Sequence, residues 1–354
     1  MPGAGEYART VSRVLEHCRT VGDERTLRRQ VIEELRAVLG FDSYAWLLTD
    51  PETSVGVSPL AEVTWLGELP RQIELKYRTS VNRWTTLDDT SVALLSQVTG
   101  GDLTQSLVWR DLLVRYDVGD VASVVFKDRF GCWGFLELWR AGERGPFNAT
   151  DAACLAAVVK PLTLALRRCL ASTFLPGSVR HVPHVGPIVL VLSPALEVRG
   201  QTPETTDTLR TLVPPAENRS PVPASAYNVA AQLRAVEEAV DSNPPMARVH
   251  LQHGVWVTAR AARIAGVGPP RHHDIAVTIE ESSPPERVDL FARVFGLSTR
   301  EHELLKHLVA GRATKELAQT MWVSENTVQD HLKSIFAKTS SRSRQSLLAR
   351  ALGG

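Results

Sequence analysis

The segment that most restricts the fold of this chain covers residues 322–338, WVSENTVQDHLKSIFAK. Ser324 is a suitable helix cap, because its side-chain oxygen can accept a hydrogen bond from a free backbone N–H of the first turn. At about 100° per residue, Val328, Leu332 and Ile335 lie within about 60° of one another on such a helix. This apolar stripe predicts a helix that packs on a core along one side and leaves its opposite side exposed.

The opposite side of this helix carries short or polar side chains of the kind that contact base edges. They are Asn326, Asp330, Lys333 and Ala337, flanked by Gln329 and Ser334. The preceding residues, 314–321, have a helical stripe of their own and are joined to this helix by a tight turn. Two short helices with a turn of about four residues form a helix-turn-helix, whose second helix enters the major groove of DNA.

Residues 297–354 divide into four expected helices and are more basic than the rest of the chain. Ser298 and Glu301 have the S-x-x-E spacing of a capping box at the start of the first helix. This tail contains nine Lys and Arg against five Asp and Glu, whereas the net charge of the whole chain is +1. A small basic module on a slightly acidic body is typical of an effector attached to a sensor.

The tail is similar to the LuxR/NarL-type DNA-binding domain, whose pattern is L-T-x-R-E-x-E-V-L, G-x-S-N-K-E-I-A, I-S-x-x-T-V-K-x-H-L and K-L-x-V-x-x-R. The matching residues are Leu297, Arg300, Glu301, Glu303, Leu304, Leu305, Gly311, Lys315, Glu316, Leu317, Ala318, Val323, Ser324, Thr327, Val328, His331, Leu332, Lys338 and Arg344. The resemblance implies a regulator of transcription that binds double-stranded DNA. It places Thr327, Gln329, Asp330 and Lys333 in the groove, Thr314, Lys315 and Asn326 at phosphates, and Arg344 at the backbone.

The tail departs from this family pattern at several positions. Ala313 stands where a Ser usually caps the second helix, so we expect Thr314 to cap it instead. Gln329 replaces a Lys, which removes one cation that could reach a phosphate, and Asp330 follows it. These changes predict a narrower sequence preference and weaker non-specific binding, with complete loss of DNA binding as the alternative. Polar residues also replace two apolar packing positions, Thr339 and Ser341.

Upstream of the tail, two α+β modules are expected. Residues 1–172 begin with two helical patterns and continue with a strand and a strand hairpin. They close with a long helix, which Thr150 or Asp151 is expected to cap and Pro161 to kink. The order of these elements and the G-x-x-E-L-x-R end of the hairpin resemble a GAF domain. Residues 188–284 combine a strand pair, helices and three returning strands, which resembles a PAS fold.

The expected architecture is therefore multidomain, with two α+β modules and an all-α helix-turn-helix domain of four helices. The expected bounds are 1–172 (GAF-like), 173–187 (linker), 188–284 (PAS-like), 285–296 (hinge) and 297–354 (helix-turn-helix). Low complexity over residues 213–225 predicts a mobile excursion inside the PAS-like module. His253 and Gly254 are expected to form a turn between two of its strands.

Six of the eight tryptophans precede residue 140. One interpretation is an aromatic-lined ligand pocket in the first module, with Trp46, Trp65 and Trp133 as its candidate residues. The other is ordinary core and hairpin packing. The sequence alone leaves both open.

Several classes of chemistry have no motif in this sequence. His302 and His307 are five positions apart, about 140° around a helix, so a shared zinc ion is not expected. We find no phosphate-binding Gly-rich loop, no nucleophile elbow, no acidic receiver pocket and no signature of acyl-homoserine-lactone receptors. We therefore expect no enzyme activity, no metal and no cofactor. Without a signal-peptide pattern or an apolar run of about 18 residues, we expect a cytoplasmic protein with no membrane contact.

Two functions are compatible with these observations. The first is a sequence-specific transcription regulator, homodimeric through its fourth helix, whose upstream modules sense a small molecule or a partner. The alternative is a signalling adaptor, in which the upstream modules bind a protein partner and the tail serves mainly for dimerisation. Duplex affinity at low salt would separate the two.

Overall fold

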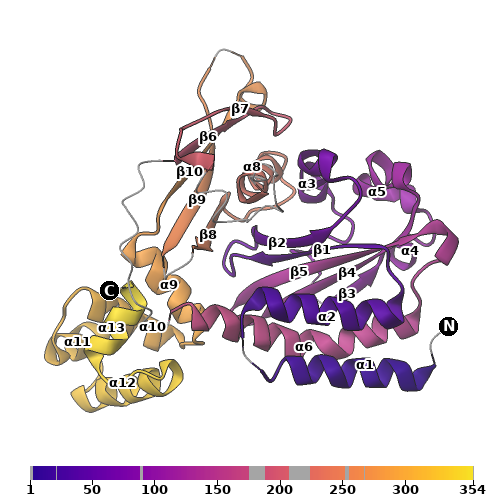
Figure 1. Cartoon of the computed structure of the whole chain (residues 1–354). Coiled ribbons are helices and arrows are strands. Elements are labelled where there is room, and N and C mark those ends of the chain that lie inside the picture. The colour runs from indigo at the N-terminus through magenta and orange to yellow at the C-terminus, as the bar shows by residue number, and fades with distance from the viewer. Residues whose placement is uncertain are drawn as a thin grey trace. The chain divides into compact units, whose positions relative to one another are not determined.

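The computed structural model describes residues 3–20, 22–87, 91–174, 188–206, 224–251, 255–266 and 268–353. Figure 1 shows the chain coloured by residue number. Its contacts divide it into two units, which are described separately. Unit 1 comprises Met1–Cys169, His184–Val249 and Thr258–Glu280, and unit 2 comprises Leu170–Pro183, His250–Val257 and Glu281–Gly354.

The first sheet of unit 1 is antiparallel, with the strand order β2-β1-β5-β4-β3. The predicted hairpin forms β4 and β5, and the predicted first strand forms β1 next to them. Trp46 of β1 lies opposite Leu136 of β5, and Ala45 lies opposite Glu137, so neighbouring residues point to opposite faces. The strands are β1 (Ser43–Thr49), β2 (Gly56–Glu62), β3 (Val92–Leu94), β4 (Val118–Asp128) and β5 (Gly131–Ala141).

Helices cover both faces of this sheet, with α1, α2 and α6 on one side and α3, α4 and α5 on the other (Figure 1). Helix α2 begins after Asp23, whose carboxylate accepts from two backbone N–H groups, and ends at Gly40 in the left-handed region, as predicted. The helices are α1 (Ala4–His17), α2 (Glu24–Leu39), α3 (Leu69–Arg78), α4 (Leu95–Val98), α5 (Leu107–Asp111) and α6 (Ala149–Ser172). Short 3₁₀ turns are η1 (Leu66–Glu68), η2 (Leu103–Gln105), η3 (Leu113–Tyr116) and η4 (Gly142–Arg144).

Helix α6 differs from its prediction in its cap, and the predicted kink at Pro161 stays a prediction. Its cap is Asn148, whose side chain accepts from the backbone N–H of Thr150 and Asp151, so neither of those residues is the cap. Pro161 lies inside the helix without ending it. By length and composition alone α6 could also cross a membrane, since its most apolar window has a mean hydropathy of 1.5. Half of that window is buried in the protein, as in the core helix of a soluble protein.

The second sheet has the strand order β7-β6-β10-β9-β8, which repeats the order of the first sheet. Its strands are β6 (Ile188–Leu192), β7 (Val198–Gln201), β8 (Met246–His250), β9 (Trp256–Arg263) and β10 (Ile275–Glu281). Helix α8 (Ala224–Glu237) and the turn η6 (Pro270–His272) belong to the same region. The predicted His253–Gly254 turn, nearly all of the predicted 173–187 linker and most of the predicted excursion at 213–225 lie outside the described residues.

Buried ion pairs hold the second sheet to the first within unit 1. Arg248 of β8 donates to both carboxylate oxygens of Asp50, which follows β1, at 2.7 and 2.8 Å. Arg83 donates to Asp241 at 2.6 Å, and its side chain is fully buried. Helix α8 packs on α3 and β2, and Ser225 donates to the Val57 carbonyl at 2.9 Å.

In the part of unit 2 that the structure describes, most residues are helical, β8 and β10 end and β9 begins, and the elements surround an aromatic cluster. Phe174, which follows α6, stacks on Trp256 with ring centroids 5.3 Å apart. Phe291 packs edge-on against the ring of Phe174, with ring centroids 5.4 Å apart. The residues predicted as a hinge form most of helix α9. The helices are α9 (Pro284–Val294), α10 (Thr299–Val309), α11 (Thr314–Met321), α12 (Glu325–Thr339) and α13 (Arg344–Leu352).

Candidate nucleic-acid interface

The three apolar residues of the predicted stripe seat α12 in the core of unit 2. Val328, Leu332 and Ile335 are all buried, which confirms the orientation that the sequence predicts. Ser324 caps the helix by accepting from the backbone N–H of Thr327 at 3.1 Å. The opposite side of α12 therefore faces outward.

Glu301 fixes α12 against α10. Its carboxylate completes the predicted capping box with Ser298 and accepts from Ser334 and Lys338 of α12, each at 2.6 Å. Burial alone would raise the pKa of Glu301, but these hydrogen bonds outweigh it and lower the pKa to about 2. The charged carboxylate thus sets the angle at which α12 is presented.

We expect Glu301→Gln to destabilise unit 2 by about 2 kcal/mol at pH 7, because it removes charge-assisted hydrogen bonds. The folded pKa is below the ordinary value of 4.5, so the contribution is present above pH 4.5 and is lost as the pH falls toward 2. Urea unfolding of both proteins across this range should show the difference shrinking. Glu303→Gln, on the exposed side of the same helix, is the control. A difference independent of pH would contradict this account.

The four predicted groove residues (Thr327, Gln329, Asp330 and Lys333) lie on the outward side of α12 together with Asn326, a predicted phosphate contact, and we call these five residues the recognition face. Thr327 is partly exposed and the other four are exposed. Lys333 donates to Asp330 at 3.1 Å, and both side chains are about three-quarters exposed. An exposed pair of this kind is worth about 0–1 kcal/mol, so a DNA base could separate it at little cost.

The other predicted phosphate contacts, Thr314 and Lys315, lie on α11, and the predicted backbone contact Arg344 lies on α13. Lys315 is exposed at the start of α11. Thr314 does not cap that helix, contrary to expectation: the cap position is Ala313, whose backbone N–H donates to Glu316 at 2.8 Å. The Thr314 hydroxyl instead accepts from Arg344 at 3.1 Å, which ties the start of α13 to the start of α11.

The two polar residues at apolar packing positions are accommodated by hydrogen bonds. Thr339 and Ser341 are both buried, and their hydroxyls are 2.9 Å apart. Thr339 also donates to the Ile335 carbonyl at 2.8 Å. The substitution therefore leaves the turn between α12 and α13 intact.

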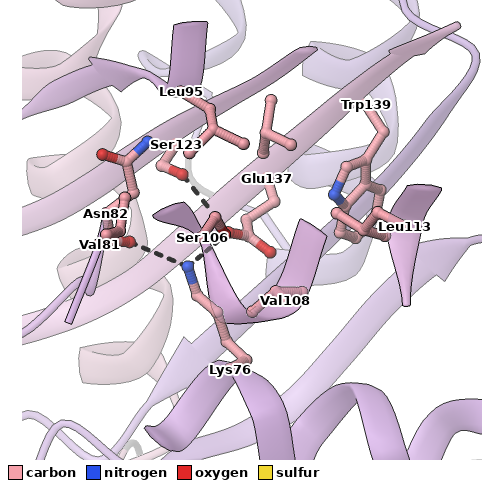
Figure 2. A pocket seen from close by; sticks show the side chains of 11 residues that line it. Lys76, Val81, Asn82, Leu95, Ser106, Val108, Leu113, Ser123, Glu137 and Trp139 are labelled. Atoms are coloured by element: carbon pink, nitrogen blue, oxygen red, sulfur yellow. Dashed lines mark hydrogen bonds and ion pairs between the residues drawn. The ribbon is translucent and has the colours of Figure 1, made fainter. Parts of the chain in front are cut away.

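A second candidate site is a small polar cavity in unit 1, between the first sheet and helices α3 and α5 (Figure 2). Lys76 of α3 donates to Glu137 of β5 at 2.5 Å and to the Asn82 carbonyl at 2.9 Å. The cavity has a volume of about 20 Å³, enough for one water molecule. Its polar lining residues are Lys76, Asn82, Ser106, Ser123, Glu137 and Trp139.

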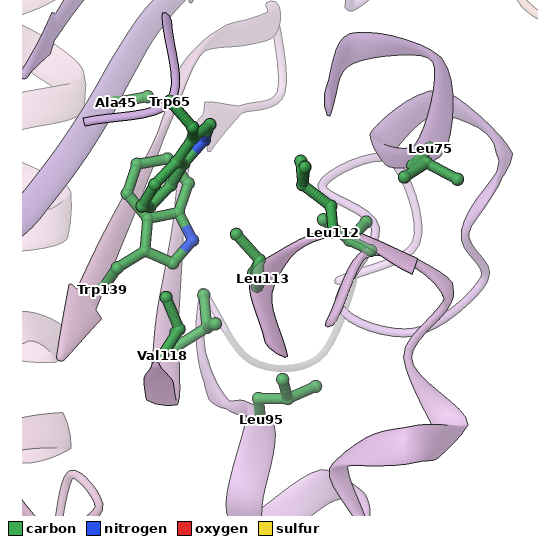
Figure 3. Packing of buried hydrophobic residues seen from close by; sticks show 10 residues of the cluster. Ala45, Trp65, Leu75, Leu95, Leu112, Leu113, Val118 and Trp139 are labelled. Atoms are coloured by element: carbon green, nitrogen blue, oxygen red, sulfur yellow. The ribbon is translucent and has the colours of Figure 1, made fainter. Parts of the chain in front are cut away.

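Polar atoms of this cavity lack partners among the described residues. Both side-chain atoms of the Asn82 amide and the indole nitrogen of Trp139 are buried without a hydrogen bond there. Buried polar groups are normally satisfied, so such atoms indicate a water or a ligand group. An apolar cluster beside the cavity, shown in Figure 3, packs Trp139 edge-on against Trp65 with ring centroids 5.4 Å apart.

The three tryptophans proposed as pocket residues do not share one face of the first sheet. Trp65 belongs to the apolar cluster on the α3–α5 side and donates to Gln72 at 2.8 Å. Trp46 points to the opposite face and stacks on Phe126 at 5.1 Å. Trp133 donates to Asp128 near the hairpin end at 3.0 Å. Of the three, only Trp65 lies near the polar cavity.

Sequence reasoning missed two features of these sites. Lys76 and Glu137 stand in apolar stretches, IELKY and GFLELW. A charged residue at a position that is expected to be buried was the sequence signal for this buried pair. Trp322, in the helix-turn-helix turn, is 93% exposed. The sequence signal for this exposure was a large aromatic residue that belongs to the apolar stripe of neither helix.

The helix-turn-helix geometry agrees with a match to a known family. Residues 296–351 match the model described as bacterial regulatory proteins, luxR family. No curated protein matches the chain.

Solved structures show weak similarity to the whole chain. A crystal structure of Escherichia coli SdiA aligns with 97% of this chain and 96% of that chain, at 11% identity and a TM-score of 0.34. SdiA in complex with octanoyl-rac-glycerol aligns with 99% of this chain and 97% of that chain, at 12% identity and a TM-score of 0.31. A Vibrio cholerae VqmA dimer is 14% identical, with a TM-score of 0.18, over 49% of this chain and 83% of that one. TM-scores this low support no conclusion about this chain, so only the family match of residues 296–351 does so.

Proposed function

Residues 296–351 form a LuxR-family helix-turn-helix domain at the C-terminus, and from this premise we propose that the chain is a sequence-specific, DNA-binding regulator of transcription. The observation that carries the proposal is the exposed recognition face of α12 opposite the buried Val328, Leu332 and Ile335. Nothing in unit 2 covers this face among the described residues. Regulators of this family are generally non-enzymatic and cytoplasmic, and we extend both properties to this chain.

The side chains of the recognition face suggest which bases they read. Gln329 can pair with N6 and N7 of adenine, Asp330 can accept from N4 of cytosine, and Lys333 can donate to guanine. Thr327 would meet the groove beside them, with Asn326, Lys315 and Thr314 at phosphates. Because Arg344 holds Thr314, we propose that it supports the backbone contact as well.

We propose that two copies bind together through α13. Leu348, Ala349 and Leu352 line a hollow on the outer side of this helix, and Leu352 is 37% exposed. A two-fold dimer places its two recognition helices on half-sites one helical turn apart. Sequences selected from a random duplex pool should therefore be inverted repeats.

We expect Lys333→Ala to weaken binding of a selected duplex about tenfold and to relax the preference at one base position. The matched control is Arg300→Ala. Arg300 also belongs to an exposed pair three residues apart, with Glu303, so both variants lose one charge and little stability. Fluorescence anisotropy over a range of salt concentrations, on selected and random duplexes, measures both effects. Equal losses in the two variants would contradict base reading by Lys333.

The polar cavity favours a sensory role for unit 1. We propose that unit 1 senses a small polar molecule, and that this cavity, which admits one water molecule, must widen to accept a group that bonds to the Trp139 N–H and the Asn82 amide. Isothermal titration with acetamide, acetate and glycine tests whether the cavity widens for a neutral, an anionic or a zwitterionic probe, each of which is larger than one water molecule. Asn82→Gly is the matched variant, because Asn82 has a φ of 51°, which glycine adopts without strain. Binding that survives this substitution would place the ligand elsewhere.

We also propose a domain type for each of the two sheets of unit 1. We interpret the first sheet and its helices as GAF-like and the second sheet as PAS-like, since both have the strand order 2-1-5-4-3. Ligand binding would then shift the dimer equilibrium or free the C-terminal domain. The adaptor alternative predicts partner binding with no duplex affinity at low salt, so the anisotropy experiment also decides between the two.

A further inference from the structure

Trp322 is the most exposed large apolar residue in the described part of the chain, at 93%. It forms the turn between α11 and α12 with φ 56° and ψ 45°, the left-handed region that bulky side chains rarely adopt. Glycine or asparagine is the usual choice for such a helix end. The indole thus occupies a position where the backbone would favour a smaller residue.

The fold of unit 2 does not account for this side chain. Among the described residues, the indole of Trp322 has no ring contact and no hydrogen bond, although its backbone N–H bonds to the preceding turn. The neighbouring Met321 and Val328 are buried and Val323 is half-buried, so the turn is anchored without it. An exposed tryptophan in a backbone conformation that favours glycine is available for contact with another molecule.

The position of the turn points to DNA as the molecule that Trp322 contacts. Trp322 stands two residues before Ser324, the cap of α12, and the second helix of a helix-turn-helix inserts its N-terminal residues into the major groove. In that docking mode the turn would lie at the mouth of the groove, next to the sugar-phosphate chain. An indole offers a flat apolar face to deoxyribose and one N–H to a phosphate oxygen.

The recognition face has little net charge, so an apolar contact can contribute a substantial part of the affinity for DNA. Asp330 and Lys333 neutralise each other in the free protein, and Gln329 stands where the family carries a cation. Electrostatic attraction from α12 is therefore small, and apolar burial can supply affinity that salt does not screen. We propose that Trp322 packs against the DNA backbone at the edge of the groove. This inference rests on the proposed DNA-binding function.

Trp322 can be observed on its own in the full chain. The other seven tryptophans are buried or half-buried, so acrylamide should quench mainly the Trp322 emission. Saturation with a selected duplex should protect that emission. Trp322→Gly should show no such accessible fraction with or without DNA, and its thermal stability should equal or exceed that of the parent, since glycine suits the left-handed turn.

In the same buffers we expect Trp322→Gly to bind the selected duplex about tenfold more weakly, with an unchanged slope of affinity against salt. An indole that stays accessible at saturation, or a variant that binds as tightly as the parent, would overturn the inference and leave a protein partner as the occupant. The DNA-binding function fails separately, when the unsubstituted chain binds no duplex at low salt. That result would remove this inference with it.

Discussion

Replacing Phe174 by alanine is expected to lower the stability of unit 2 by about 4 kcal/mol. The ring is 2% exposed and lies between Trp256 and Phe291, so its removal leaves a cavity that neighbouring rings cannot fill. Arg287 also lies over the ring, 5.2 Å from its centroid. Urea unfolding of the full chain, followed by helical circular dichroism, measures the loss.

Two further variants show whether the packing of the ring is the cause. Phe174→Leu keeps most of the volume and should cost about 1 kcal/mol. Val309→Ala removes a half-buried apolar side chain from the same unit, away from the proposed dimer surface, and should cost less than about 1 kcal/mol. Equal losses for alanine and leucine at position 174 would contradict a cavity. The duplex affinity of folded Phe174→Ala should stay near that of the parent, because the recognition face is unchanged.

A minimal DNA-binding fragment would lack part of the aromatic cluster formed by Phe174, Trp256 and Phe291. A fragment of residues 281–354 contains the helix-turn-helix but neither Phe174 nor Trp256. Arg350 of α13 donates to the Phe174 carbonyl at 3.3 Å, and Arg287 donates to the Ala351 carbonyl at 3.1 Å. The first of these bonds is also lost in the fragment. A difference in DNA affinity between fragment and full chain therefore needs a stability measurement before it is attributed to autoinhibition.

The helix-turn-helix could be predicted because its signals are local. The spacing of Val328, Leu332 and Ile335 and the caps Ser298 and Ser324 depend only on neighbouring residues. The cap of α11 was predicted wrongly at Thr314 because its hydroxyl is bound by Arg344, thirty residues away. A partner at that distance leaves no mark on local spacing.

The region between β1 and β4 was the least predictable part of unit 1. Strand β2 contains Pro59, which argues against a strand but is tolerated because β2 is an edge of the sheet. Helix α3 buries Glu74 and Lys76, so its stripe looks polar. Their partners include Arg234 and Glu137, which lie far along the chain, and only the assembled unit makes these positions core positions.

The predicted tryptophan-lined pocket was also wrong, because it depended on contacts between residues that are distant in the sequence. Counting aromatic residues identified a tryptophan-rich module, but the face that each residue joins depends on strand alternation for Trp46 and on the loop after β2 for Trp65. Trp46 and Trp65 ended on opposite sides of the sheet. The unsatisfied atoms that indicate a binding cavity belong instead to Asn82 and Trp139.

The second large effect is expected from Arg248→Met, which should destabilise unit 1 by about 4 kcal/mol. Asp50 is 1% exposed, and the substitution leaves its charge buried without the guanidinium that now pairs with both oxygens. The matched control is Arg36→Met. Arg36 makes a similar two-bond pair with Glu62, but both side chains are exposed, so the loss should stay below about 1 kcal/mol.

A double variant and a pH series test the cause of this loss. Arg248→Met combined with Asp50→Leu removes both charges, so it should recover most of the stability that the single variant loses. Burial alone would raise the pKa of Asp50, but the charge and hydrogen bonds of Arg248 outweigh it and hold that pKa below its usual value. In Arg248→Met only the raising effect remains, so Asp50 should take up a proton at a higher pH than in the parent.

The parent and the single variant should therefore respond oppositely to acid. In the parent, the pair contributes stability above the unfolded pKa of Asp50, and this contribution is lost as the pH falls through the lower, folded value. In Arg248→Met, protonation neutralises the buried charge, so the difference between the two proteins should narrow from pH 7 toward pH 4. Urea unfolding at several pH values measures it. A constant difference would mean that lost packing of the arginine stem, rather than the unpaired carboxylate, causes the destabilisation.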